Sequence, residues 1–370
     1  MSKVIPLTLA TNYVSSWGVW QAVRELIANA IDCGEGNYKV SLDYDEGSIT
    51  ITTYAGTIPQ QYLLMGAGSK SLGDGNIGQF NEGLKLAMLV LTRECKEVNI
   101  ANGTTDWTPS LRYSDTFGTE HLHVAIDEDT GGVAGQVTIS VHGMTYSELS
   151  EVEGKYLQPK DYGEHFKAQE GIVLLDEKHA GNIYCGGIYV SHNTGLTKGY
   201  NFNTKELSLD RDRETVREFD IQYITRKMLD QMSRKVEHLD DVVDMITNNS
   251  TDTAIMGSVY SPVQNQDLKE AVFDKYMEEH EGAVLAESYD DKKKLEASGV
   301  QGVVFLGNDV FTNIVTQSQG YKELHMNRVI EHKSISSVLM DFRDKYYQDM
   351  GESMLDSFDD MVQTIQTLQE

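Results

Sequence analysis

The sequence predicts an α+β protein that begins with a layer of helices on one face of a mixed sheet. Two segments, 19–32 and 82–93, carry apolar residues at helical spacing. Several other segments alternate apolar and polar residues as strands do, and turn residues separate them. The order of helix, hairpin, glycine-rich loop, helix and strands is typical of an α/β sandwich around one hydrophobic core.

The first helix, 19–32, has an apolar stripe on one side and a polar stripe on the other. At about 100° per residue, Asn29 falls ~40° from Glu25, and Asp32 falls ~20° from it on the other side. The helix can therefore bury one face and present two carboxylates and an amide to a single site. Oxygen ligands of this kind suit Mg²⁺, and a glutamate one turn from an amide can activate a water. An ordinary amphipathic helix would also have such a polar face.

The strands are expected to follow one another through tight turns. Asp45-Glu46-Gly47 is the expected turn of a hairpin, and four more strands follow the second helix. The expected strands are 38–43, 48–53, 97–102, 107–114, 120–126 and 136–142.

Two further domains are expected, so that the chain divides into 1–145, 146–256 and 257–370. The middle part has expected elements at 145–158 (helix), 171–176 and 183–191 (strands) and 211–236 (helix). A polar stretch at 247–254 is the expected linker. In the last part, strands are expected at 283–287 and 300–306, with acidic helices toward the end.

The composition is that of an acidic protein without a membrane or secretion signal. The formal net charge of −26 repels nucleic-acid phosphates, so direct nucleic-acid binding is not expected. No apolar run reaches the ~18 residues that span a bilayer. The first residues lack the charged-then-apolar layout of a secretory signal. These features predict a cytoplasmic protein.

Cysteine and histidine give no strong metal-binding pattern. Cys33, Cys95 and Cys185 lie far apart, and their odd number argues against a disulfide framework. His121 and His123 share one face of a strand, where they either seat a metal or form an ordinary, partly exposed pair.

A glycine-rich loop leads into the second helix, and residues 66–85 read GAGSKSLGDGNIGQFNEGLK. Glycines let backbone N–H groups approach phosphate oxygens, and a helix N-terminus favours an anion. Lys70 and Lys85 would add positive charge. Because flexible surface loops have a similar composition, the loop alone is weak support for phosphate binding.

Together, the helix and the loop resemble two motifs of the GHKL ATPase superfamily. Residues 24–32, RELIANAID, resemble the N box, close to its form in MutL, topoisomerase VI and heat-shock chaperones. Residues 77–85, IGQFNEGLK, resemble the second glycine box and lid, and the order of the segments also matches. The resemblance implies a Bergerat-type sandwich in 1–145 and, by position alone, a transducer-like α/β domain in 146–256. The small C-terminal α/β unit in 257–370 follows from its own pattern of strands and helices, and partner binding is the default expectation for it. The motifs are also similar to those of phage-encoded GHKL proteins.

The resemblance implies ATP as nucleotide and Mg²⁺ as metal. Glu25 would be the general base, Asn29 would bind Mg²⁺, and Asp32 would support the nucleotide pocket. Residues implied to cover or contact the phosphates are Ser69, Lys70, Gly78, Gln79, Phe80, Gly83 and Lys85. Lys198 is the candidate for the lysine that a transducer domain sends to the γ-phosphate, although an exposed loop lysine would look the same.

The first glycine box departs from the family pattern Asp-x-Gly-x-Gly. Thr53 stands where the family has the aspartate that accepts a hydrogen bond from adenine, and of the glycines only Gly56 remains. A hydroxyl can still bond a base, but it lacks the charge-assisted bond, at an expected loss of ~1–3 kcal/mol. This departure predicts relaxed base preference or weakened nucleotide binding.

Two functions follow. The first is Mg²⁺-dependent, slow ATP hydrolysis, in which lid closure switches homodimerisation or the engagement of a protein partner. The alternative is a degenerate GHKL scaffold without turnover, whose acidic surface binds or inhibits a protein partner. The Glu25 and Asn29 pair favours the first function, and Thr53 with the net charge favours the second.

Overall fold

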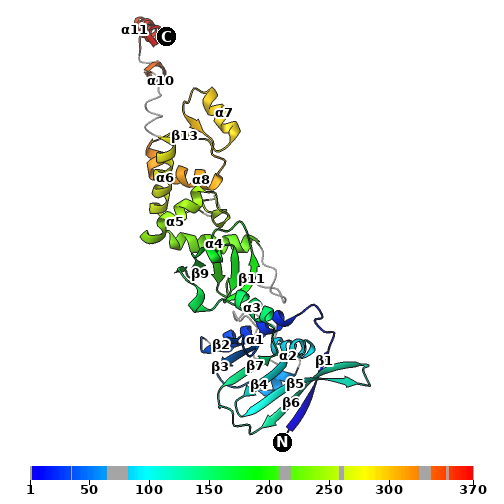
Figure 1. Cartoon of the computed structure of the whole chain (residues 1–370). Coiled ribbons are helices and arrows are strands. Elements are labelled where there is room, and N and C mark those ends of the chain that lie inside the picture. The colour runs from blue at the N-terminus through cyan, green and yellow to red at the C-terminus, as the bar shows by residue number, and fades with distance from the viewer. Residues whose placement is uncertain are drawn as a thin grey trace. The chain divides into compact units, whose positions relative to one another are not determined.

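The protein is described by a computed structural model over residues 2–34, 36–64, 82–207, 218–257, 262–324, 335–346 and 350–369. The described residues form a mixed α+β protein with two compact units, Met1–Met228 and Leu229–Glu370 (Figure 1). The sequence-based boundaries at 145 and 256 remain a prediction. No helix in these ranges combines the length and apolar character that crossing a membrane requires.

The first unit contains a seven-stranded sheet in the order β1-β6-β5-β4-β7-β3-β2. Its strands are β1 (Ser2–Ala10), β2 (Tyr38–Asp43), β3 (Ser48–Thr53), β4 (Glu97–Asn102), β5 (Thr105–Ser114), β6 (Thr119–Glu128) and β7 (Val137–His142). Every described pairing in this sheet is antiparallel. The expectation of a mixed sheet is therefore wrong for these strands, because alternation of apolar and polar residues records a strand but not its direction.

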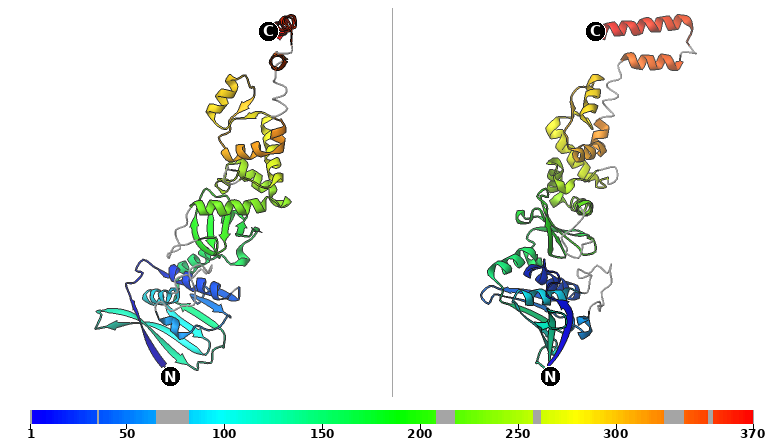
Figure 2. Two further views of the ribbon diagram at one scale, coloured as in Figure 1. Left: turned by 180° about the vertical axis from the view of Figure 1, so that it is seen from behind. Right: turned by 90° about the vertical axis from the view of Figure 1, so that its right-hand side faces the viewer.

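Two helices cover one face of this sheet, α1 (Val19–Gly34) and α2 (Gly83–Arg93) (Figures 1 and 2). Both bury an apolar stripe against the strands, and the shared core includes Val23, Ile27 and Trp107. Burial of each large apolar side chain contributes about 1.5–3 kcal/mol, so this core holds the helices in a fixed position over the sheet. The helix α3 (Tyr146–Lys155) packs beside α1 and begins with a capping box between Thr145 and Glu148.

The β2–β3 hairpin forms as the sequence predicts. The side chain of Asp43 accepts hydrogen bonds from the backbone N–H groups of Asp45 and Glu46, at 3.0 and 2.9 Å. Gly47 then adopts a φ of +57°, which glycine does without steric penalty. This turn sets the register in which Tyr38 faces Thr53.

A second, five-stranded sheet completes the first unit, in the order β11-β10-β12-β9-β8. Its strands are β8 (His165–Lys167), β9 (Gly171–Leu174), β10 (Asn182–Cys185), β11 (Ile188–His192) and β12 (Gly199–Phe202). The strand expected at 183–191 is in fact two strands, because the chain turns at Gly186 and Gly187, whose φ angles are +58° and +83°.

The second unit is mainly helical, with a small parallel pair of strands, β13 (Val284–Leu285) and β14 (Val303–Val304). Its core surrounds the buried ring of Tyr276, which contacts Phe311 and Tyr321. The described helices are α4 (Glu218–Met232, which crosses the unit boundary), α5 (Val236–Thr247), α6 (Gln266–His280), α7 (Tyr289–Ala297), α8 (Asp309–Gln317), α10 (Ile335–Tyr346) and α11 (Glu352–Gln369).

Two details of the second unit differ from the sequence-based expectation. The helix expected at 211–236 is present as α4, but it ends at Met232, and a separate helix, α5, begins at Val236; residues 208–217 lie outside the described residues. The polar stretch 247–254 is packed, since Asp252 and Thr253 are buried and bond Ser250. Polar residues that satisfy one another in a tight turn resemble a linker in sequence.

Candidate functional site

A cavity of about 210 Å³ lies between α1, the end of β3, β7 and the start of α2. Its lining is mostly apolar, with a few polar side chains, which is the usual character of a small-molecule site. Five of the site residues named from the sequence line it: Asn29, Thr53, Gly56, Gly83 and Lys85. Site residues as far apart in the sequence as Asn29 and Lys85 therefore line one cavity.

Glu25 is buried on α1 at the side of α2. One carboxylate oxygen, Oε1, lies 3.3 Å from the guanidinium of Arg24, which is also buried and lies over the ring of Trp17, 5.5 Å from its centroid. The other oxygen, Oε2, faces Gly83, where an added β-carbon would come within 2.7 Å of it. One oxygen of the Glu25 carboxylate is thus in an ion pair, and the other lies next to the first turn of α2.

Asn29 lies one turn further along α1 and lines the cavity. Its side-chain amide would lie 3.4 Å from a β-carbon on Gly83. Because Gly83 has no side chain, the first turn of α2 packs directly against Glu25 and Asn29. Any larger residue at position 83 would push α2 away from them. A ligand bound beside Gly83 could contact the Asn29 amide, the Glu25 carboxylate and the first N–H groups of α2.

Lys85 is buried in the first turn of α2, and its ammonium bonds backbone carbonyls rather than pointing freely into the cavity. Nζ donates to the carbonyl oxygens of Tyr62 and Leu64, at 2.9 and 2.7 Å. Burial lowers the pKa of Lys85 below its usual 10.5, and the nearby Glu82 carboxylate opposes this shift. Lys85 thereby holds the end of the 3-10 helix η1 (Gln60–Leu63) against the beginning of α2.

The segment after β3 forms the opposite wall and is fixed by Asn102, a buried residue at the end of β4. The Asn102 side chain accepts a hydrogen bond from Ile58 N–H at 2.7 Å and donates one to Ile58 C=O at 2.8 Å. Gly56, with a φ of +124°, donates from its N–H to Gly135 C=O at 3.1 Å. These bonds hold the wall next to Thr53.

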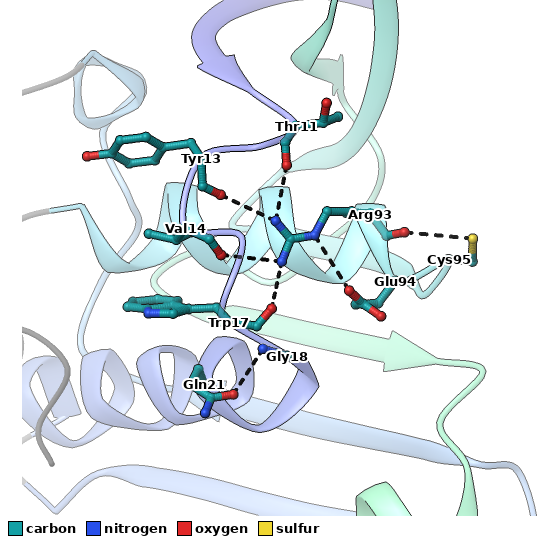
Figure 3. Close-up of polar contacts among 9 residues, drawn as sticks. All are labelled: Thr11, Tyr13, Val14, Trp17, Gly18, Gln21, Arg93, Glu94 and Cys95. Carbon is teal, nitrogen blue, oxygen red and sulfur yellow. Dashed lines mark hydrogen bonds and ion pairs between the residues drawn. The ribbon is translucent and has the colours of Figure 1, made fainter.

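The loop before α1 is tied to the far end of α2 by Arg93 (Figure 3). Its guanidinium donates to the carbonyl oxygens of Thr11, Tyr13, Val14 and Trp17, at 3.1, 3.3, 3.4 and 2.6 Å. Because this loop leads directly into α1, Arg93 fixes the position at which the helix that carries Glu25 and Asn29 begins.

The other residues named from the sequence are not found in the cavity lining that the described part of the chain forms. Asp32 lies on α1, half-buried, and is not among the described residues that line the cavity; the same holds for Lys198, in the loop before β12. Ser69, Lys70, Gly78, Gln79 and Phe80 lie outside the described residues.

Sequence reasoning missed Asn102, Tyr62 and Cys33 as parts of the site. Tyr62 and Cys33 line the cavity, and Asn102 positions a wall of it. An asparagine at a strand end, followed by Gly103 at a φ of +61°, is an ordinary turn signal, so its bonds to Ile58 had no local trace in the sequence.

The histidine pair on β6 forms a contact of its own outside the cavity. Nε2 of His121 and Nε2 of His123 lie 3.0 Å apart, so one ring donates and the other accepts. Burial, His121 and Arg112 lower the pKa of His123 below its usual 6.5. Within the described ranges no group of three or more metal-ligating His, Cys, Asp or Glu side chains occurs.

Comparison with known proteins does not assign a family. No family model matches the chain. The chain is similar to an uncharacterized protein of Mycoplasma pneumoniae, with 24% identity over 221 residues, which cover 55% of this chain and 87% of that protein. The function is therefore argued from the site.

Proposed function

We propose that this chain is a GHKL-type protein that binds ATP with Mg²⁺ in the cavity between α1 and α2. The observation that carries the proposal is the seating of Gly83 against Glu25 and Asn29 beside that cavity. The first turn of α2, the Glu25 carboxylate and the Asn29 amide then lie together where the phosphates of a nucleotide bound in the cavity would extend.

The size and lining of the cavity fit part of a nucleotide. A volume of about 210 Å³ is below the ~300–1,000 Å³ of typical ligand pockets, so it suits a base with its ribose better than the whole of ATP. Thr53 offers the base a hydroxyl at one wall. The triphosphate would extend past Asn29 toward the first turn of α2.

In this proposal, the residues have separate roles. The Asn29 amide oxygen would bind Mg²⁺, which a hard oxygen ligand suits, and the metal would neutralise phosphate charge. Glu25 would orient and deprotonate the attacking water, while Arg24 keeps its other oxygen engaged. Turnover would be slow, and ligand-dependent closure would switch self-association or partner binding.

Calorimetric titration with ATP, GTP and a non-hydrolysable ATP analogue, with and without Mg²⁺, tests the proposal. Asn29→Ala should abolish the Mg²⁺-dependent part of binding. Glu25→Gln should keep binding and stop phosphate release, whereas Glu97→Gln, an exposed glutamate on β4, should change neither. Absence of binding by the unmodified protein at millimolar nucleotide would refute it.

A second function, a scaffold without turnover, is favoured by two contacts of the same site. The Glu25 carboxylate is engaged by Arg24, and the Lys85 ammonium is engaged by two backbone carbonyls. Both charges that would act on a phosphate or a water are thus already satisfied. In that case nucleotide binding without phosphate release, unchanged by Glu25→Gln, is the expected result.

A further inference from the structure

The strand β2 is an edge of the seven-stranded sheet, and its outer side carries backbone groups that can pair. In the described part of the chain, β3 is its sole partner strand (Figure 1). An edge strand presents a row of N–H and C=O groups to any extended chain that reaches it.

The register shows which residues of β2 present these groups outward. Tyr54 N–H donates to Asn37 C=O at 3.1 Å, so this pair is a hydrogen-bonded pair of the antiparallel ladder. Hydrogen-bonded pairs alternate along such a ladder. The residues that face β3 are therefore Lys39, Ser41 and Asp43, and the residues whose N–H and C=O groups face outward are Tyr38, Val40 and Leu42.

Two of the usual protections of an edge, a proline and a bulge, are missing from β2, although it carries the charged side chains Lys39 and Asp43. It contains no proline, and its six pairs with β3, from Tyr38 to Asp43, run without a bulge. By contrast, β1 at the other edge contains Pro6 and has a register shift between Pro6 and Ala10. Edges are commonly blunted in those ways, so β2 is the edge that remains competent to pair.

A groove of about 560 Å³ runs beside this edge and is walled by the end of α3 and by residues 156–160. Two hydrogen bonds hold that wall next to the strand. Tyr44 donates to Glu153 at 2.6 Å, and Tyr156 donates to the hydroxyl of Tyr38 at 3.1 Å. The edge therefore opens into a bounded trough instead of a flat surface.

The charge of the groove differs from that of the whole chain. Lys39 and Lys160 line it, and its one described carboxylate, Glu153, accepts the hydrogen bond from Tyr44. The chain as a whole carries a net charge of −26. The two lysines attract an acidic segment to the groove, whereas the net charge of the whole chain opposes the approach of a second copy.

We propose that β2 binds an extended acidic peptide segment of a partner protein as an added strand in this groove. The peptide's backbone would pair with the outward groups of Tyr38, Val40 and Leu42. Its carboxylates would lie near Lys39 and Lys160. Main-chain bonds give affinity in this mode and flanking side chains give selectivity. The proposal does not depend on nucleotide binding.

Hydrogen exchange of the full chain tests it, with a short blocked peptide of alternating glutamate and threonine as probe. Without the probe, the amides of Tyr38, Val40 and Leu42 should exchange faster than those of Lys39, Ser41 and Asp43. Saturating probe should slow the first three and leave the others unchanged. Uniform protection of the strand, or protection elsewhere, overturns the proposal.

Charge reversal provides the matched test. The double variant Lys39→Glu with Lys160→Glu should weaken binding of the acidic probe by about tenfold or more, because it replaces two attractions with two repulsions. Lys3→Glu, an exposed lysine on β1, makes the same kind of change outside the groove and should have no effect. Equal binding of a lysine–threonine probe, no binding at millimolar probe, or self-association that accounts for the protection would each refute it.

Discussion

Gly83 lies directly against Glu25, so closely that a β-carbon at position 83 would meet Oε2 of the carboxylate at 2.7 Å. The two residues are far apart in sequence and come from helices that pack on each other over the same sheet. This contact brings the N-box-like segment and the beginning of α2 together. Position 83 therefore needs glycine because of its contact with Glu25, and not because of the backbone conformation of the helix.

Gly83→Ala should displace the Glu25 carboxylate while the fold persists. The position is helical, so alanine suits the backbone and offsets part of the steric cost. The buried carboxylate must move to make room. Under the proposed function, phosphate release should therefore fall by about tenfold or more, because the proposed general base is displaced. Steady-state hydrolysis and thermal unfolding, measured together, check this.

Gly154→Ala is the control for that substitution. Gly154 also lies in a helix, but nothing stands within 4 Å of its added β-carbon. It should raise the free energy of unfolding by up to about 1 kcal/mol and leave nucleotide turnover unchanged. Equal loss of turnover in both variants would contradict the role given to the Gly83 contact.

Asn102→Ala should loosen the wall of the cavity. It removes the two bonds that hold Ile58 and leaves the N–H and C=O of that residue without their partner, at a cost of about 1–3 kcal/mol in stability. Nucleotide affinity should fall with it, as titration calorimetry would show. Asn99→Ala makes the same change on the same strand, at a position that pairs with Ser140 of β7, and should leave affinity intact.

Thr53→Asp should raise the preference for ATP over GTP, because a carboxylate at that wall can accept a charge-assisted bond from the adenine amino group. A gain of about tenfold in the ATP:GTP affinity ratio is expected. Thr50→Asp places the same carboxylate on the same strand at a position that does not line the cavity, and should not change the ratio. Competition binding of the two nucleotides measures it.

Local patterns predicted the elements next to the site well. The helix at 19–32 and the hairpin strands at 38–43 and 48–53 are present, because amphipathic period and turn chemistry are both local. β1 was not predicted, since Pro6 interrupts its alternation of apolar and polar residues. An edge strand tolerates proline because the missing N–H can face away from the neighbouring strand.

Long-range contacts were less accessible. The Asn29 and Gly83 approach was anticipated only through the motif order, and the bonds from Asn102 to Ile58 join residues 44 positions apart without any local trace. For Lys85 the sequence suggested a charge near phosphates, whereas its ammonium bonds two carbonyls. A side chain's partner depends on which backbone groups the fold leaves unsatisfied.

Lys85→Met should release the stretch 60–64 from α2 while keeping the apolar stem of the side chain packed. The carbonyls of Tyr62 and Leu64 lose their donor, so amide exchange and proteolysis within this stretch should speed up while α2 stays protected. Lys3→Met, at an exposed lysine on β1, is the control and should leave exchange at 60–64 unchanged. Lys96→Met would not serve, since Lys96 forms an ion pair with Glu148. Unchanged exchange at 60–64 in Lys85→Met would contradict the tie.

His123 should make the fold sensitive to mild acid. Burial, His121 and Arg112 lower its pKa in the folded chain below 6.5, so the unfolded chain binds the proton first as the pH falls. The stability that a neutral His123 contributes is therefore complete above about pH 6.5 and is lost as the pH drops through 6.5 toward the folded-state pKa. His123→Gln should flatten the fall in unfolding free energy over that window, measured by denaturant titration at a series of pH values. His165→Gln, which removes an exposed histidine, should keep the wild-type slope, and identical slopes for both variants would refute the assignment to His123.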